Sequence, residues 1–556
     1  MKKLFLLICA FSAIFTGFAQ QNEGQLHGNF QMDMQSYAED TLIGASKAPE
    51  IALMNSYANF NYTKGKFSAG VRYEGYLNTL QGYMNEGKRN DKVGFPYKYA
   101  TYASDELEVT VGNYYDQFGN GLIFRSYEDK LLGYDNAMQG VRIRYNPFKG
   151  LTLKGIVGQQ RYYFDYTGLV RGIDGELVLN ELEALSKMKP YLILGGSFIS
   201  KYQEDKDPVY ILPENVAAMA GRMNLYWGKF SLSSEYAYKI NDPSTENGLI
   251  YKPGNAILVN ATFSQKGLGV FASFKRVDNM GFRSYRTATL NNLIINNLPV
   301  VTKNHTYALM AFYPYATQTN GEVGGQLEVM YKFKKGTLLG GKYGTNLSVN
   351  FSQVNGLIKT QPNDSTAIGT PGTLGYITEP YSTGDSLGNS PFHLGDELFF
   401  NDINVEISKK INKKLKLKYN FMYFDYNQGI IEGHGDMVHG NVNVLDITYK
   451  LMPKHALRLE MQHMYTKQDK GNWAMGLLEY SVSPSWFFTI IDQYNYGNSD
   501  EAHQTHYYKA AIGYTKKANR IQIGYGKQRE GILCVGGVCR AVPAANGFTI
   551  SITSSF

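Results

Sequence analysis

Residues 548–556 read Phe548-Thr549-Ile550-Ser551-Ile552-Thr553-Ser554-Ser555-Phe556, and this stretch decides the fold. Large apolar residues alternate with small polar ones, and a period of two predicts a β-strand with one apolar and one polar face. The run ends on an aromatic residue. Such a strand, in a chain that begins with a secretion signal, is typical of the last strand of a bacterial outer-membrane β-barrel. We expect the barrel-assembly machinery to recognise its apolar face, which consists of Phe548, Ile550, Ile552 and Phe556.

The first 19 residues have the pattern of a secretion signal. Met1-Lys2-Lys3 is basic, residues 4–16 are apolar, and Gly17 and Ala19 are small residues at the positions that a signal peptidase requires. The apolar run is shorter than the ~20 residues that span a bilayer as a helix. We therefore predict a cleaved signal peptide at 1–19 and one barrel domain at 20–556, located in the outer membrane of a Gram-negative cell.

The composition agrees with a membrane barrel. The mean hydropathy of −0.31 would suit a soluble protein, but lipid-facing and lumen-facing residues cancel in a barrel. The chain has 44 Tyr, 30 Phe and 58 Gly, which serve interfacial girdles, bulges and turns. Removing Lys2 and Lys3 with the signal lowers the net charge from +7 to +5. This small, scattered charge argues against a nucleic-acid partner.

Alternating segments along the chain are joined by short turns and long loops in alternation, as in outer-membrane barrels. Eleven short connections predict about 24 antiparallel strands, within a range of 20 to 26. We place the short turns in the periplasm and the long loops outside the cell. One apparent slip of phase, at 442–447, predicts a β-bulge. The long loops are predicted at 38–48, 79–96, 116–138, 162–172, 203–214, 240–253, 279–321, 353–395, 428–436 and 498–505.

The loop at 116–138 contains more large apolar residues than a surface loop needs, and it also carries opposed charges. One interpretation is that it folds into the barrel as a constriction. Arg125, Glu128, Asp129 and Lys130 would then face wall charges such as Arg142 and Arg144, and such rings of charge select solutes. The alternative is a loop packed on neighbouring extracellular loops.

The polar phase of the strands contains more basic than acidic residues. A basic lumen would favour anions, although these charges could also pair with one another across the lumen. The basic residues are Arg142, Arg144, Lys154, Lys239, Lys416, Lys418, Arg458 and Arg520, against Glu235 and Glu460.

Two cysteines, Cys534 and Cys539, flank a pair of glycines near the C-terminus. In an exported protein this spacing favours a disulfide at a hairpin tip. Free thiols, or a metal or redox role, remain the alternatives. We identify no metal site, no cofactor motif and no catalytic constellation, so an enzyme is not expected.

The segment from Gly112 to Asn136, and the segment from Cys534 to Arg540 followed by Val542-Pro543 and Asn546-Gly547, resemble a family of outer-membrane barrels from Bacteroidota. The resemblance covers essentially the whole mature chain and implies a porin-like barrel without a plug domain. It implies no particular activity. A more distant likeness to polysaccharide-export and substrate-specific porins is an analogy of fold.

Two functions are consistent with these features. The first is passive passage of small polar or anionic solutes, narrowed by the 116–138 loop. The second is a structural or accessory barrel that is occluded by its own loops and docks a lipoprotein or a secretion or assembly partner. In both cases outer-membrane lipids surround the barrel.

Overall fold

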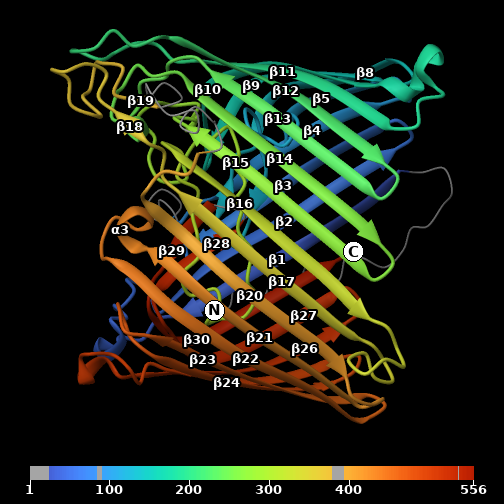
Figure 1. The fold of residues 1–556 in the computed structure, drawn as a ribbon, viewed down its shortest axis with the longest axis vertical. Helices are drawn as coiled ribbons and strands as arrows, with labels where there is room; N and C mark the ends of the chain where they lie inside the picture. Colours follow the sequence, from blue (N-terminus) through green and yellow to red (C-terminus); the bar gives the residue numbers. More distant parts are fainter. Residues whose placement is uncertain (1–23, 84–89, 379–392, 536–537) are drawn as a thin grey trace.

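The computed structural model describes residues 24–83, 90–378, 393–535 and 538–556. These residues form a closed antiparallel barrel of 24 strands, which confirms the predicted fold and strand number (Figure 1). The signal peptide predicted at 1–19 lies outside the described residues. Among those residues, no helix is long and apolar enough to cross a membrane.

The wall strands, in chain order, are β1 Gln25–Ser36, β2 Ala52–Lys64, β3 Phe67–Leu77, β4 Val93–Ala103, β5 Leu107–Tyr114, β8 Met138–Phe148, β9 Leu151–Tyr162, β10 Asp165–Val178, β11 Tyr191–Tyr202, β12 Asn215–Trp227, β13 Phe230–Lys239, β14 Gly254–Gln265, β15 Leu268–Asp278, β16 Glu322–Phe333, β17 Thr345–Asn355, β20 Leu398–Lys410, β21 Leu415–Asn427, β22 Met437–Met452, β23 His455–Thr466, β24 Trp473–Val482, β25 Trp486–Tyr494, β26 His506–Lys516, β27 Asn519–Gln528 and β30 Ala545–Ser555.

Short elements lie in the connections between the wall strands. They are η1 Thr41–Ile43, β6 Glu128–Asp129, β7 Tyr134–Asp135, η2 Leu179–Glu181, η3 Glu183–Leu185, η4 Thr245–Asn247, β18 Lys359–Thr360, β19 Ile377–Thr378, α3 Gln428–Ile431, η5 Glu501–His503, β28 Gly531–Val535 and β29 Val538–Val542.

The first and last strands close the barrel. β1 pairs with β30 from Asn29 opposite Ser555 to Gln35 opposite Thr549. The backbone N–H groups and carbonyls of Gly28 and Phe556 extend this ladder, with an N···O distance of 3.0 Å in each direction. Closure leaves no unpaired sheet edge, which a barrel in lipid could not tolerate.

The connections at the two ends differ in length. Eleven lie at the end that holds Phe556, most of them tight turns, and one is the 179–190 connection with η2 and η3. All eleven agree with the predicted short turns. At the other end most connections are longer loops, several of which carry the short elements β18, β19, α3, β28 and β29 (Figure 1). We call this the loop end.

One prediction about the loops was wrong. The predicted 162–172 loop is a tight turn between β9 and β10, in which Tyr163 has a φ of 61°. The cluster of aromatic and polar residues there belongs to the strand ends rather than to a loop. The connections at 467–472 and 529–544 were not among the predicted long loops, although a disulfide at a hairpin tip was predicted within the second.

The two faces of the wall alternate along each strand. In β30 the hydroxyl residues Thr549, Ser551 and Thr553 lie opposite Gln35, Asp33 and Gln31 of β1, so this polar set faces the lumen. Phe548 is 59% exposed on the opposite face. Large apolar side chains are exposed around the outside of the barrel, as lipid contact requires.

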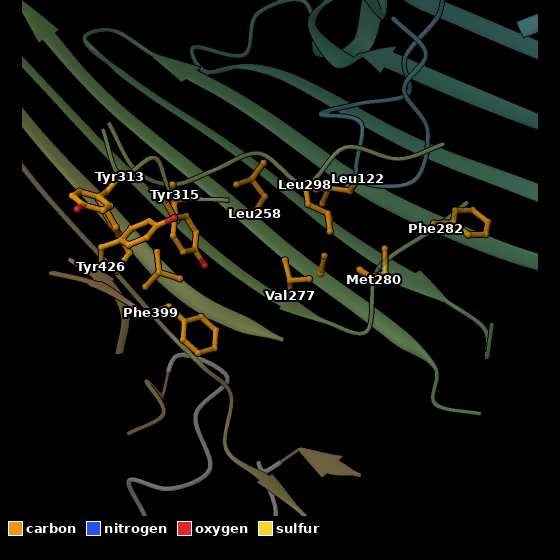
Figure 2. Close-up of a cluster of buried hydrophobic side chains, with 14 of the residues drawn as sticks. Leu122, Leu258, Val277, Met280, Phe282, Leu298, Tyr313, Tyr315, Phe399 and Tyr426 are labelled. Atoms are coloured by element: carbon orange, nitrogen blue, oxygen red, sulfur yellow. The ribbon is translucent and has the colours of Figure 1, made fainter. Parts of the chain in front are cut away.

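The interior of the barrel contains a large hydrophobic core. Two loop-end connections, 115–137 and 279–321, contribute buried apolar side chains that pack against lumen-facing wall residues. We call these connections the first and second infolded segments. Figure 2 shows Leu122 of the first beside Leu298 of the second, with Leu258 and Val277 of the wall nearby.

The structure has no bulge at 442–447, where one was predicted. β22 pairs with β21 and β23 without a shift through these residues, and the register shift with β23 lies at 450–452. Val442 and Val444 face inward and are fully buried in the core. The inner face is apolar at Val442 and Val444 because protein fills the lumen beside them, whereas further along the strand Leu445 and Ile447 are apolar on the outer face. This change of face imitates a slip of phase in the sequence.

Candidate functional site

Charges on the wall hold the first infolded segment in place. Asp116 accepts hydrogen bonds from the Arg142 Nε at 2.6 Å and from the Lys154 Nζ at 2.9 Å. Further along, the backbone N and the Nδ2 of Asn120 donate to Glu235 Oε2 at 2.6 and 2.9 Å. The segment is therefore fixed to strands β8, β9 and β13, across the inner face of the wall.

The second half of this segment lies against a buried ionic cluster. Arg72 on β3 binds Glu74 at 2.8 Å and Glu128 at 2.9 Å, and it also contacts Asp135. Arg161 on β9 binds Glu74 at 2.7 Å and also contacts Asp135. Two arginines of the wall thus meet two carboxylates of the infolded segment.

The cluster shifts the pKa values of the two loop carboxylates in opposite directions. Burial raises the pKa of Glu128, and Arg72 offsets only part of this effect. Burial also acts to raise the pKa of Asp135, but Arg161 and Arg72 overcome it and lower the value to about 2. Asp135 is therefore the charged anchor of the segment at neutral pH.

The six residues predicted for a constriction do not form one ring. The Arg125 guanidinium lies 4.1 Å from the centre of the Tyr127 ring, and Glu128 belongs to the Arg72 cluster. Asp129 accepts a hydrogen bond from the Leu132 backbone N–H at 3.1 Å. Lys130 lies 4.9 Å from the centre of the Tyr57 ring.

The two wall residues of the predicted constriction, Arg142 and Arg144, also differ in their surroundings. Arg142 pairs with Glu108 and with Asp116 rather than with the four charges at 125–130. Arg144 is exposed on β8. The partner of Arg142 that was not predicted, Asp116, lies in the infolded segment, and its distance from Arg142 and Lys154 in sequence leaves no local pattern that would identify it.

The second infolded segment is bound to the wall in a similar way. Lys275 on β15 and Glu322 on β16 form a completely buried ion pair within the wall at 2.6 Å. The Lys275 ammonium also donates to the Pro299 carbonyl of the segment. The Leu309 backbone N–H donates to Gln462 Oε1 at 2.9 Å. The Tyr307 hydroxyl donates to Asp446 at 3.2 Å. These contacts span strands β15 to β23.

The prediction of a basic lumen needs correction. The basic residues of the lumen face are paired with carboxylates, as the alternative interpretation expected. Arg458 binds Glu460 and also Asp446, and Lys418 lies 3.9 Å from Glu406; Asp446 and Glu406 were not among the predicted lumen charges. Because these basic residues are paired with carboxylates, they do not give the lumen a general preference for anions.

A third loop-end connection, 529–544, contacts both infolded segments. The structure joins Cys534 and Cys539 as a disulfide between β28 and β29. The Asn291 side chain of the second segment donates to the Cys539 carbonyl, and the Arg540 Nε donates to the Leu131 carbonyl of the first segment at 2.8 Å. The disulfide hairpin thus bridges the two infolded segments.

A cavity of about 430 Å³ lies at the rim of the loop end, and a second of about 370 Å³ lies inside the wall. The second, which we call the seam cavity, lies along β1, β30, β27 and β26, where the barrel closes. Its lining is mostly polar, with Gln31, Gln522, Thr549 and Ser551 among the residues. The infolded core packs against other strands, so this side of the lumen is less filled.

The seam cavity has an excess of positive charge. Three cations, Lys130, Lys509 and Arg540, line it together with one carboxylate, Asp33. Asp33 already accepts hydrogen bonds from Gln31, at 2.8 Å, and from Ser551. Among the described residues, no carboxylate lies within ion-pairing distance of Lys509. Of the predicted constriction residues, only Lys130 lines this cavity.

The sequence matches the Family of unknown function (DUF6029) over residues 1–556. The chain belongs to this family. No curated protein gives a significant match.

Solved outer-membrane receptors and porins are similar to the barrel at low identity. The siderophore receptor PirA from Pseudomonas aeruginosa shares 10% identity, with 97% of this chain and 81% of that chain covered and a TM-score of 0.39. The copper transporter OprC shares 9% identity, with 96% and 80% covered and a TM-score of 0.41. OccAB4 from Acinetobacter baumannii shares 9% identity, with 85% and 99% covered and a TM-score of 0.35. These values give no basis for transferring a ligand or an activity.

Proposed function

We propose that this family member is an outer-membrane channel for small polar or anionic solutes, and that solutes pass beside the infolded segments along the seam cavity. The observation that carries the proposal is the location of this cavity, inside the wall at the strands that the hydrophobic core leaves uncovered. Its amide and hydroxyl lining suits hydrated solutes, and its three cations suit anions.

The apolar outer surface and the closed barrel support a location in the outer membrane. A 24-stranded barrel is wide enough to conduct strongly when it is empty. The two infolded segments reduce that width, so we expect a small, selective conductance rather than that of a general porin.

The test is single-channel conductance of the purified full chain in a planar bilayer, with a salt gradient to measure ion preference. We expect a low conductance with anion preference. Lys130→Glu and Lys509→Glu should each shift the preference toward cations, because each reverses a charge in the seam cavity. Lys149→Glu is the matched control, because Lys149 is 84% exposed on a tight turn at the opposite end.

The packed interior of the barrel also supports a second function. The buried core and its ion pairs would also suit an accessory barrel that is closed to solutes and docks a protein partner through its loops. A sealed wild-type barrel would exclude the channel and favour this alternative. An open barrel in which both charge reversals leave the ion preference unchanged would exclude the seam cavity as the path.

A further inference from the structure

A groove of about 480 Å³ lies on the outer face of the barrel, away from the proposed path. It crosses strands β1 to β5 in the part of the wall nearer the end that holds Phe556. We call it the outer groove. Its volume is in the range of small-molecule sites, which is about 300–1,000 Å³.

Exposure and strand geometry place this groove on the lipid-facing side of the wall. Its lining residues Leu26, Val71 and Val111 are 53%, 40% and 56% exposed. Val71 precedes Arg72, which belongs to the buried ionic cluster inside the barrel. Because successive residues of a strand point to opposite faces, Val71 points outward. The groove therefore opens toward the bilayer.

The floor of the groove consists of small residues. Ala69 on β3 lies directly opposite Ala100 on β4. Larger residues flank this pair on the same face: Tyr62 lies opposite Ala69, and Val111 lies opposite Ala100. Apart from one lysine and two tyrosines, the lining side chains carry no polar group. This shape and this chemistry suit a hydrocarbon chain.

Lys98 is the only charged residue of the lining. It lies directly opposite Val71, so it also points outward, and its side chain is exposed. Among the described residues, no carboxylate lies within ion-pairing distance of its ammonium. On the inner side of the wall, by contrast, Lys275 is paired with Glu322. An unpaired lysine that faces lipid is unfavourable unless its ammonium reaches a polar partner.

The nearest polar region is the membrane surface at the end that holds Phe556. Lys98 is four residues from Tyr102, whose ring packs against Phe67 with 5.1 Å between the ring centres. Phe67 is the first residue of β3 after a tight turn, and aromatic residues at such positions mark the interface. Four residues of a tilted strand cover only about 10 Å along the membrane normal. A lysine stem can lie along apolar surface while its ammonium extends toward the lipid headgroups.

We propose that the outer groove binds one anionic phospholipid from the leaflet at this end. An acyl chain lies over Ala69 and Ala100, and the lipid phosphate pairs with the Lys98 ammonium. A zwitterionic headgroup brings its own cation beside the phosphate, so an unpaired lysine favours a headgroup with a net negative charge. The inference rests on the barrel lying in a bilayer and does not require an open lumen.

The test is native mass spectrometry of the purified full chain in detergent. The protein is titrated with dioleoylphosphatidylglycerol, and with dioleoylphosphatidylcholine as the zwitterionic counterpart with the same acyl chains. The dissociation constant of the first bound lipid is measured for each. We expect phosphatidylglycerol to bind about fivefold more tightly, because one basic residue near an anionic lipid surface contributes about 1 kcal/mol.

Four variants separate the charge from the groove. Lys98→Leu should abolish the preference for phosphatidylglycerol, and Lys98→Arg should retain it. Lys149→Leu should also retain it, because Lys149 is 84% exposed on a tight turn at the same end but outside the groove. Ala100→Phe fills the floor of the groove and should weaken the binding of both lipids. All these positions are exposed, so a heat-modifiable band on a gel should show that each variant folds.

Three results would overturn the proposal. The first is equal affinity of the wild-type protein for the two lipids, which is expected of lipid that merely surrounds a barrel. The second is a preference that survives in Lys98→Leu, or that is lost equally in Lys149→Leu. The third is wild-type affinity for both lipids in Ala100→Phe. Because conductance is not measured, failure of this site and failure of the channel are distinguishable.

Discussion

At the scale of single residues, a buried ion pair joins two neighbouring wall strands, and its lysine also holds the second infolded segment through the Pro299 carbonyl. Lys275 and Glu322 are both completely buried, with 2.6 Å between the ammonium and the carboxylate. Removing one member of such a pair leaves an uncompensated charge, which costs about 3–5 kcal/mol, whereas replacing both members by apolar residues is often neutral.

We therefore expect Lys275→Met to lower the temperature at which the folded barrel is lost on a heat-modifiability gel, and Lys275→Met/Glu322→Leu to recover most of the loss. Lys149→Met, which breaks an exposed pair with Glu181 at 2.6 Å, should have little effect. Equal losses in the single and double variants would contradict this role of the buried pair.

The ionisation of Asp135 predicts that the stability of the folded protein depends on pH. Its pKa is lowered to about 2 from an ordinary value of 3.8, so it binds fewer protons in the folded protein. The stability from Asp135, about 2 kcal/mol, is fully present above about pH 4 and is lost as the pH falls through about 2. Thermal midpoints between pH 5 and 2 should fall less steeply for Asp135→Asn than for the wild type. Parallel curves would argue against this anchor.

At the scale of elements, the second infolded segment is the main obstacle in the lumen. Its side chains Leu309, Met310 and Phe312 are buried in the interior core. Replacing residues 285–316 by a short Gly-Ser linker should raise the single-channel conductance severalfold, because conductance follows the open width of the barrel. Shortening the 467–472 loop is the control and should leave it unchanged. An unaltered conductance in the first variant would contradict the placement of the segment.

At the scale of the whole molecule, the barrel depends on the pairing of β1 with β30. Gln31 lies directly opposite Thr553 on the lumen face. Cysteines at these two positions should form a disulfide under mild oxidation in the folded protein, detected by a mobility shift on a non-reducing gel. Gln31→Cys with Ile552→Cys should not cross-link, because Ile552 points to the opposite face. The reverse result would contradict the register of closure.

The sequence by itself determined the wall of this protein. The alternation in strands such as 548–556, the eleven short turns and the lengths between them predict 24 strands, and these signals are local because a strand has a side-chain period of two. The apolar residues at 118–124 also indicated a segment that needs burial, although they left open whether it packs inside or on other loops.

Only the tertiary structure decided what fills the lumen and where space remains. Asp116, Lys275 and Arg72 each have partners from strands or loops distant in sequence, and no local pattern identifies these contacts. The apolar inner face of β22 looked like a bulge until the packed core explained it. Arg286 is an ordinary arginine in the sequence, and only folding buries it without a carboxylate in ion-pairing distance among the described residues. Contacts of this kind depend on how loops cross the barrel, which the periodicity of the strands does not record.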